Sequence, residues 1–467
     1  MVLIIGQNKM CAKFRTLSLR REITMKKIIP NMVSATALAL CMGCSTTDME
    51  QPDGKVWRKG ALHCHTLWSD GRSLPETAVQ TYKNLGYDFM CISDHNVYPE
   101  GDLWLPVQRE TGPWPCNLGS VEYEHAKKLM KGNVISKKIS FRTYVKLRTM
   151  KELQELFNEE DKFLLVPGEE ITVMGLKFND RPGTYQNHFN VFNIAKTFPP
   201  LSGKTGTETV KKNFEQYKKA VNSNPAHSFF MVNHPYSWAW DVDPVTVLDN
   251  PEITHFEICN NGSSIPVDHI FSAEKFWDFI LAHRLDRGQN IIYGTATDDS
   301  HFYIDAVGKY SGNNLGWVMV NCPGKMTGNS LAEALNRGDF YATNGVILED
   351  VTLDSNAKTL TVKVKAEKNV NYQIRFIVTN KNFDRSIEYR EFPAKEPKYT
   401  RKLPIIPENI GTTALTVKGS EGSYKLKDDD LYVRAIVISD KKSRFQAPLY
   451  PETECAWTQP LVNKHLK

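Results

Sequence analysis

One stretch, residues 62–96, constrains the fold more than any other, because metal-ligand side chains stand at the ends of its two apolar runs. His63 and His65 are separated by one residue, so in a strand both imidazoles point to the same side. One metal ion can therefore take both. The Ser-Asp-Gly turn that follows carries Asp70 and can swing its carboxylate back toward the same point.

A helix is expected between these two apolar runs. Pro75 suits the first turn of a helix, Tyr82 lies on its apolar face, and Gly86 suits its end. The chain then re-enters the core as an apolar run that delivers Asp94 and His95 at its far end. These features predict one βαβ unit with polar residues at both strand exits.

The same pairing of an apolar run with polar side chains recurs as far as residue 301. The polar groups beside the later runs are Glu169, Glu170, His188, His234, Asn260, Asp298, Asp299 and His301. Parallel αβ barrels place function at the carboxyl ends of their strands, so these side chains are expected to meet. Six of the twelve histidines lie at such boundaries, and we interpret the six together as metal ligands. The others are interpreted as structural or surface residues: His125, His227, His255, His269, His283 and His465.

Several short motifs, taken in order, resemble the polymerase and histidinol phosphatase (PHP) domain. They are His-x-His, Ser-Asp-Gly, Ile-Ser-Asp-His-Asn, Pro-Gly-Glu-Glu, Asn-His-Pro and Asp-Ser-His. The resemblance implies an α/β fold, a distorted (β/α)7 PHP barrel over residues 56–345, that holds a trinuclear metal site. A small all-β sandwich is expected over residues 350–463, where apolar and polar residues alternate with period two.

The resemblance also implies which residues hold each metal. The first would be held by His63, His65, Glu170 and Asp299, the second by Glu170, His188 and His234, and the third by Asp70, His95 and His301. Glu170 is preferred to Glu169 because the family pattern puts one residue between Pro-Gly and the ligand. Asp299 is preferred to Asp298 because Asp-x-His puts both side chains on one side of an extended segment. The residues we assign to catalysis are Asp299, Glu170 and His95.

Four further residues are candidates for supporting roles. Asp94 and Glu257 are candidates for orienting the ligands, although ordinary hydrogen bonding explains them equally well. The irregular stretch 97–150 predicts a long loop over the site. Its basic residues are interpreted as a solvated face or, more specifically, as placing Arg142 or Arg148 on an anionic substrate.

The ligand types favour one class of chemistry. Histidines and carboxylates without thiolates suit zinc, manganese or iron, and nine candidate ligands are more than one ion needs. Two or three divalent ions are therefore expected, zinc or manganese before iron. Such a cluster suits hydrolysis of a small phosphorylated molecule, as a monoester or a diester. Two alternatives remain: a lipoprotein that binds metal without turnover, and an amidohydrolase-like enzyme that cleaves C–N or C–O bonds.

Residues 1–44 resemble a leader followed by a lipoprotein signal peptide. Lys26 and Lys27 precede an apolar run that is too short to span a bilayer and ends at Cys44, the expected lipidation site. Residues 45–55 would then serve as a tether. The chain is expected to be secreted across the inner membrane and held in the bacterial cell envelope by its lipid anchor alone, on the periplasmic face or the cell surface.

The charge balance excludes a nucleic-acid footprint on the part of the chain after the signal peptide. The whole chain has a net charge of +5, but its first 43 residues hold seven Lys or Arg and one Glu, which leaves −1 from Cys44 onward. The six later cysteines lack a zinc-like spacing and are expected to be mostly small core residues. No oligomeric state is predicted from the sequence.

Overall fold

The computed structural model describes residues 54–108, 118–260, 271–303, 312–444 and 451–463. The predicted signal peptide, Cys44 and nearly all of the predicted tether lie outside these residues. Within the described ranges, no helix combines the length and the apolar character that crossing a membrane requires.

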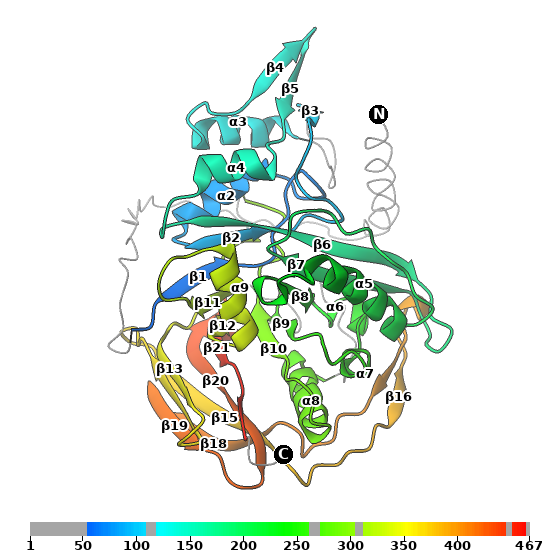
Figure 1. Ribbon diagram of the computed structural model, residues 1–467, viewed down its shortest axis with the longest axis vertical. Coiled ribbons are helices and arrows are strands. Elements are labelled where there is room, and N and C mark those ends of the chain that lie inside the picture. Colours follow the sequence, from blue (N-terminus) through cyan, green and yellow to red (C-terminus); the bar gives the residue numbers. More distant parts are fainter. Residues whose placement is uncertain (1–53, 109–117, 261–270, 304–311, 445–450, 464–467) are drawn as a thin grey trace, which may run out of the picture.

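One large sheet organises the fold and takes strands from both halves of the chain (Figure 1). Its strand order is β10-β9-β8-β7-β6-β2-β1-β11-β12-β21-β20-β15-β18, and β22 pairs with β20. The bounds of these strands are β1 (Trp57–Ala61), β2 (Phe89–Ile92), β6 (Leu164–Leu176), β7 (Tyr185–Phe192), β8 (Phe229–Val232), β9 (His255–Cys259), β10 (Tyr293–Ala296), β11 (Trp317–Asn321), β12 (Phe340–Thr343), β15 (Tyr372–Asn380), β18 (Thr412–Lys418), β20 (Asp430–Lys442), β21 (Thr453–Thr458) and β22 (Leu461–Val462).

Strand directions in this sheet are mixed. β1, β2 and β6 run parallel, as do β8, β9 and β10. β7 runs antiparallel to both of its neighbours, and β11 is antiparallel to β1. β10 lies near β11 and β12, but no ladder between described strands closes the sheet there. The fold is therefore mixed α/β with a large mixed sheet, and the distorted (β/α)7 barrel stays a prediction.

The predicted βαβ unit is confirmed. Helix α2 (Pro75–Asn84) connects β1 to β2, and these two strands pair in parallel. Pro75 occupies the first turn, where its missing N–H costs nothing, and Tyr82 is fully buried. Gly86 follows the helix with a φ of 73°, a left-handed conformation that favours glycine.

Strand β6 is longer than predicted. The sequence predicts a buried strand at 163–166 with its exit at Pro167–Glu170, whereas β6 continues to Leu176. Its first residues pair with β2 and its later residues with β7. Glu170 therefore lies in the middle of the strand, where β6 changes its partner.

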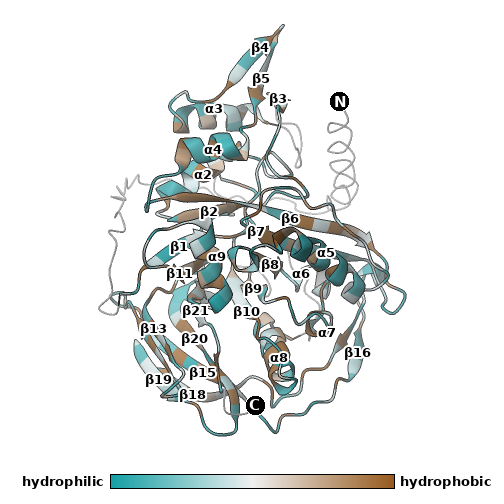
Figure 2. Ribbon diagram, in the orientation of Figure 1, coloured by the Kyte–Doolittle hydropathy of each residue, from teal (hydrophilic) through white to brown (hydrophobic). Residues whose placement is uncertain are grey.

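Helices flank the sheet, with α5 and α9 in front of it in the view of Figure 1. Figure 2 shows that α5 carries one hydrophobic and one hydrophilic face, whereas β2 is hydrophobic throughout. The sequence Thr149-Met150-Lys151-Glu152 predicts a capping box at the start of a helix, and α4 has it. Helix α9 is followed by Gly338, whose φ is 78°. The bounds of these helices are α4 (Met150–Phe157), α5 (Gly206–Val221), η1 (Pro225–His227), α6 (Ser237–Trp240), α7 (Pro244–Leu248), α8 (Ala273–Asp286) and α9 (Gly328–Arg337).

Residues 97–150 are not the long loop that the sequence predicts, because much of this stretch folds. Its elements are β3 (Trp104–Pro106), α3 (Ser120–Leu129), β4 (Ser136–Ile139) and β5 (Arg142–Lys146). The three strands form a small antiparallel sheet in the order β3-β5-β4, and the β4–β5 hairpin projects from the body (Figure 1). Val145 and Leu147 are fully buried against Leu67 and Trp68, which ties this insertion to the segment after β1.

The C-terminal part is built from strands, as the period-two pattern predicts. A separate sheet has the order β13-β14-β19, and a hairpin forms from β16 and β17. Leu360 and Val362 are fully buried in one hydrophobic cluster with Ile374 and Phe376 of the large sheet. The large sheet passes through β12 and β21 without a break near residue 345, so the predicted domain division stays a prediction. The bounds are β13 (Leu348–Asp354), β14 (Thr359–Val364), β16 (Tyr389–Phe392), η2 (Pro397–Tyr399), β17 (Arg401–Pro404) and β19 (Glu421–Lys425).

Candidate metal centre

His63 and His65 follow β1 and point to the same side, as their spacing predicts. Their Nε2 atoms lie 3.0 Å apart, and both residues are fully buried. Cys64 lies between them and pairs with Ser300 in an isolated β-bridge. Its side chain packs into a hydrophobic cluster that contains neither histidine. Burial raises the pKa of its thiol well above the usual value. In a strand Cys64 is expected to point away from the face that His63 and His65 share, and its position agrees with that expectation.

A buried carboxylate shapes the turn that carries Asp70. Asp94 accepts hydrogen bonds from the backbone N–H of Thr66 at 2.7 Å and from the hydroxyls of Thr66 and Ser69 at 2.7 and 2.6 Å. Gly71 completes the turn, because a Cβ there would come within 2.6 Å of the Thr66 backbone nitrogen. Asp94 thus supports the turn, and Asp70 reaches the histidines with Oδ1 at 3.2 Å from His301 Nε2.

Glu170 lies at the centre of the ligand cluster. Its Oε2 is 2.7 Å from His95 Nδ1 and 3.3 Å from His63 Nε2. Its Oε1 is 2.9 Å from His188 Nδ1 and 3.4 Å from His234 Nε2. One carboxylate thus contacts imidazoles from four different segments of the chain.

The neighbouring Glu169 faces the other side of β6. Its Oε2 accepts a hydrogen bond of 2.7 Å from the backbone N–H of Phe198, and burial raises its pKa to about 8. Successive side chains of a strand point to opposite faces, so only one of the two glutamates can reach the cluster. The structure places Glu170 there, as predicted.

Asp299 and His301 reach the cluster from the segment after β10. Asp299 Oδ1 lies 3.1 Å from His65 Nε2 and 3.3 Å from His63 Nε2. Asp298 points away and accepts hydrogen bonds from Tyr82 and from the backbone N–H groups of residues 314–316. Asp299 has a φ of 50°, a left-handed conformation that is uncommon outside glycine and often found at functional sites.

Glu257 contacts His63 from outside the ligand cluster. Its Oε1 lies 2.7 Å from His63 Nδ1, so that the imidazole turns Nε2 toward the other ligands. Its Oε2 accepts hydrogen bonds of 2.7 Å from the backbone N–H of His234 and from the Asn260 side chain. The orienting role predicted for Glu257 therefore has a geometric basis.

Asn233 is a site residue that sequence reasoning missed. Its amide donates a hydrogen bond of 2.9 Å to Glu170 Oε1 and another of 2.9 Å to Asn190. Thr172, also missed, lies with its hydroxyl 2.6 Å from His95 Nδ1. The Asn-His-Pro motif contained the signal for Asn233, whereas nothing in the sequence indicates the contact of Thr172.

All nine predicted ligands come together in four overlapping groups that could each hold a metal ion. The groups are His65, Asp70, His95 and His301; His63, His65 and Asp299; His63, Glu170 and His234; and His95, Glu170 and His188. Two buried ligand atoms, His65 Nδ1 and Glu170 Oε2, form no well-aligned hydrogen bond with the described residues, although Glu170 Oε2 lies 2.7 Å from His95 Nδ1. Buried polar atoms of this kind need a partner, and a divalent cation supplies one for nitrogen and oxygen donors alike. The donor set thus fits divalent metal, and the division of the ligands among ions stays a prediction.

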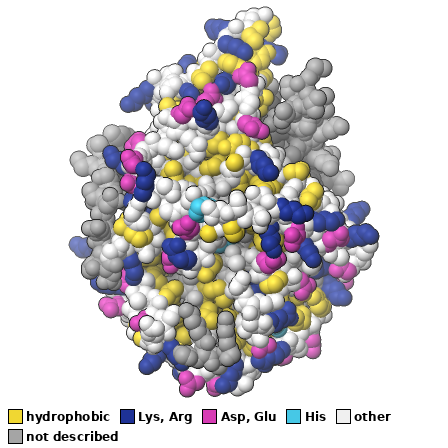
Figure 3. Space-filling model, viewed as in Figure 1, with side chains coloured by type: hydrophobic (Ala, Val, Ile, Leu, Met, Phe, Trp, Pro, Cys, Tyr) yellow, Lys and Arg dark blue, Asp and Glu magenta, His cyan; other side chains and the backbone are white. Residues whose placement is uncertain are grey.

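The electrostatics of the cluster favour anionic carboxylates. Burial by itself raises the pKa of Glu170, but the charges of His95, His63 and His188 hold it well below its usual value. The pKa values of Asp70 and Asp299 are lowered in the same way, against burial, by neighbouring histidines. Three negative charges enclosed in protein attract a cation more strongly than the same charges in water. On the face drawn in Figure 3, histidine surface is confined to small patches.

Comparisons with known proteins found similar solved structures but no matching family model and no matching curated protein. A two-domain protein from Bacteroides vulgatus containing a predicted PHP-like metal-dependent phosphoesterase aligns with 88% of this chain and 96% of its own, at 16% identity and a TM-score of 0.35. A candidate metal-dependent phosphoesterase from Bifidobacterium adolescentis covers 53% of this chain and 90% of its own, at 13% identity and a TM-score of 0.24. An amidohydrolase from Chromobacterium violaceum covers 52% and 87%, at 10% identity and a TM-score of 0.24. These scores establish no family for the chain.

The two arginines suggested for substrate binding are not brought to the cluster. Arg142 is exposed at the start of β5, on the projecting hairpin. Arg148 is buried and donates hydrogen bonds to the backbone and side-chain oxygens of Asn133, with its Nε 3.6 Å from Glu76 Oε1. Its partners, Asn133 and Glu76, do not belong to the ligand cluster. The substrate hypothesis for these residues therefore has no support from their positions.

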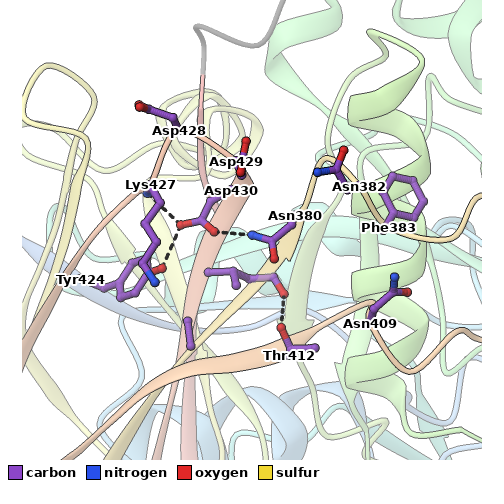
Figure 4. Close-up of a pocket in the computed structure, with 12 residues that line it drawn as sticks. Asn380, Asn382, Phe383, Asn409, Thr412, Tyr424, Lys427, Asp428, Asp429 and Asp430 are labelled. Carbon is purple, nitrogen blue, oxygen red and sulfur yellow. Dashed lines mark hydrogen bonds between the residues drawn. The ribbon is translucent and has the colours of Figure 1, made fainter.

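A separate hollow of about 520 Å³ lies in the C-terminal part, between β15, β18 and the loop before β20 (Figure 4). The Asp430 carboxylate, which lines the hollow, already accepts hydrogen bonds from the Tyr424 hydroxyl, the Asn380 amide and the backbone N–H of Lys427. The hollow contains none of the predicted ligands, so we do not assign the metal chemistry to it.

Proposed function

We propose that this protein is a metal-dependent hydrolase of phosphate esters that works with two or three divalent ions, zinc or manganese before iron. The observation that carries the proposal is the convergence of nine residues with nitrogen or oxygen ligand atoms, Glu170 among them, in four overlapping groups. A binding role alone would need fewer ligands. Ions held this way supply Lewis-acid chemistry, which lowers the pKa of water and stabilises charge during displacement at phosphorus.

The residues of the chain would divide this work. The carboxylates of Asp70, Glu170 and Asp299 carry the negative charge that holds cations, and the six histidines contribute neutral nitrogen donors. Glu257 fixes the ring of His63, and Asp94 fixes the turn of Asp70. Small phosphorylated molecules are the proposed substrates. We assign no general acid.

A matched pair of glutamates tests this proposal. Glu170→Gln removes the central ligand, whereas Glu169→Gln replaces a buried carboxyl on the same strand that faces away from the cluster. Metal content by mass spectrometry and hydrolysis of p-nitrophenyl phosphate and bis(p-nitrophenyl) phosphate are measured for both variants and for Asp299→Asn/His301→Ala. We expect bound metal and ester hydrolysis to be lost in Glu170→Gln and in the double variant, and retained in Glu169→Gln.

Other outcomes select the alternatives. Full metal occupancy with turnover of amides or lactones, but not of either ester, would favour the amidohydrolase-like reaction. Full occupancy without turnover of any of these substrates would favour a metal-binding lipoprotein.

We propose as well that the protein is exported and attached to the cell envelope by lipid on Cys44. The basis is the sequence pattern at residues 25–44. Fractionation of cells that express the chain tests it, since Cys44→Ser should move the protein out of the membrane fraction. Retention of Cys44→Ser in that fraction would argue against lipid attachment at this residue.

A further inference from the structure

The tip of the β4–β5 hairpin exposes two large apolar side chains. Phe141 is 90% exposed, the most exposed large hydrophobic side chain of the described residues, and Ile139 is 51% exposed. They flank Ser140, whose φ of 55° makes the tight turn between the strands. Removing large apolar side chains from water is favourable. Two of them exposed on a projecting tip therefore indicate a surface that binds something.

Cations surround this tip. Lys137 and Lys138 precede it and Arg142 follows it, and within the described part of the chain no acidic side chain forms an ion pair with these three residues. Residues 120–148 contain eight Lys or Arg and two Glu, although the chain from Cys44 onward has a net charge of −1. Figure 3 shows dark blue and yellow side chains together at this end of the molecule. The positive charge is thus a local property of the insertion.

The base of the hairpin is held firmly. Val145 is buried in the core of the insertion, the Lys137 ammonium lies 3.6 Å from the centroid of the Trp104 ring, and the Tyr123 hydroxyl lies 3.3 Å from Ser136 Oγ. The tip is therefore presented on a packed support.

We propose that the β4–β5 hairpin docks the protein on a bilayer that contains anionic phospholipid, in addition to any lipid anchor. Ile139 and Phe141 would enter the boundary between headgroups and acyl chains. Lys137, Lys138 and Arg142 would contact the headgroup phosphates, as basic residues beside an interfacial apolar group do. This inference is independent of the proposed reaction.

Two other occupants fit the tip less well. A nucleic acid would leave Ile139 without a suitable contact and would meet a basic surface confined to the insertion. A second copy of the chain that paired along β4, an edge strand of its sheet, would meet Lys137 and Lys138, which oppose such pairing. A bilayer takes both the apolar tip and the cations at once.

Vesicle flotation of the full chain tests the proposal. The vesicles are phosphatidylcholine alone or phosphatidylcholine with phosphatidylglycerol. All variants carry the same N-terminal segment. A ratio of partition coefficients between two variants therefore reports the contribution of the hairpin. Ile139→Ser/Phe141→Ser should lower the partition coefficient on the anionic vesicles by about tenfold or more, and Lys137→Glu/Lys138→Glu should weaken binding to the anionic vesicles alone. The matched controls on exposed strands are Leu415→Ser, at a side chain of 39% exposure, and Lys418→Glu/Lys425→Glu, and both should behave as the parent.

Hydrogen exchange gives a second, local readout on the same samples. Amides of residues 136–146 should be protected by anionic vesicles and unaffected by phosphatidylcholine alone. Equal partitioning of the parent and the hairpin variants on anionic vesicles would overturn the proposal. So would protection of the hairpin in a dimer without vesicles, which would identify a second copy as the occupant, or protection by RNA but not by vesicles.

Discussion

At the scale of single residues, the contact with Glu257 sets the orientation of the His63 ring. The 2.7 Å contact between Glu257 Oε1 and His63 Nδ1 fixes the ring and leaves Nε2 for the cluster. The Thr297 hydroxyl donates to the same oxygen at 2.7 Å, which holds the carboxylate in place. A carboxylate behind a histidine ligand also raises the basicity of the ligating nitrogen.

We therefore predict that Glu257→Gln weakens metal binding about 10- to 100-fold without abolishing it. The amide keeps the shape of the side chain but removes the charge that supports His63. Competition with a chelating dye measures the affinity. The control is Glu333→Gln, which changes another His–Glu contact, with His227, in which neither residue belongs to a ligand group. Equal affinities of Glu257→Gln and the parent would contradict the orienting role.

Glu76 is a buried carboxyl outside the cluster. Among the described residues, neither of its oxygens accepts a well-aligned hydrogen bond, and Arg148 Nε lies 3.6 Å from Oε1. Burial raises its pKa to about 7, against the lowering effects of its own backbone N–H and of Arg148. Folding therefore favours the protonated form of this group.

The sign of the resulting pH dependence follows from the raised pKa. The contribution of Glu76 to stability is complete below the unfolded pKa of about 4.3 and is lost as the pH rises through about 7. Glu76→Gln cannot ionise, so its stability relative to the parent should rise between about pH 5 and pH 8, by about 3 kcal/mol at most. Urea unfolding at several pH values measures this difference. Glu155→Gln, at a side chain of 65% exposure, should show no such trend, and a parallel trend in both variants would contradict the assignment.

The residues that the sequence places correctly are those with a local geometric signal. Asp299 rather than Asp298 follows from the spacing to His301, and Glu170 rather than Glu169 follows from the motif. Asn233 contacts Glu170 only because β8 lies beside β7, which in turn pairs with β6. Contacts of that kind depend on the strand order, which the local pattern does not contain.

At the scale of elements, α4 shows how a short helix is defined by its first turn. Thr149 Oγ1 accepts from the backbone N–H of Glu152, and Glu152 Oε2 accepts from the backbone N–H of Thr149 at 2.9 Å. Leu153 and Phe157 then pack into the core beside β2 and β6. The cap contributes a larger share of helix stability in a helix of eight residues than in a long one, because a short helix gains few hydrogen bonds by propagation.

Thr149→Ala should destabilise the protein by about 1 kcal/mol, the usual cost of losing a cap. The midpoint of urea unfolding measures the change. Lys151→Ala, on the same helix at a side chain of 87% exposure, is the control and should leave the midpoint unchanged. A Thr149→Ala midpoint equal to that of the control would show that the cap contributes nothing.

Elements with strong local signals are those that the sequence predicts best. The βαβ unit around α2 and the helix α9 carry Pro, Gly and capping signals. The antiparallel course of β7 was missed because its apolar run looks the same in either direction. The insertion was missed because β4 is exposed throughout, so that no hydrophobic pattern marks it.

At the scale of the whole molecule, the ligands are collected from segments that begin at residue 63 and end at residue 301. Buried ion pairs join the two halves around them: Arg434 to Asp278 at 2.6 Å and Arg401 to Asp241 at 2.8 Å. The strand order places β1, β6, β7, β8 and β10 within one sheet, so that no single element contains the cluster. Ions bound there would cross-link most of the fold.

Removal of divalent ions by EDTA should therefore lower the thermal stability of the whole protein. Ions that bind the native state alone stabilise it by about 2.7 kcal/mol when their free concentration is 100-fold above the dissociation constant. Differential scanning fluorimetry with EDTA, and then with excess zinc or manganese, measures the loss and its recovery. Asp299→Asn/His301→Ala should show a much smaller response to both, because Asp299 belongs to one ligand group and His301 to another. A parent that melts at the same temperature with and without EDTA, while mass spectrometry shows the ions removed, would contradict a cross-linking role. A double variant that keeps the full response would show that the stabilising ions bind elsewhere.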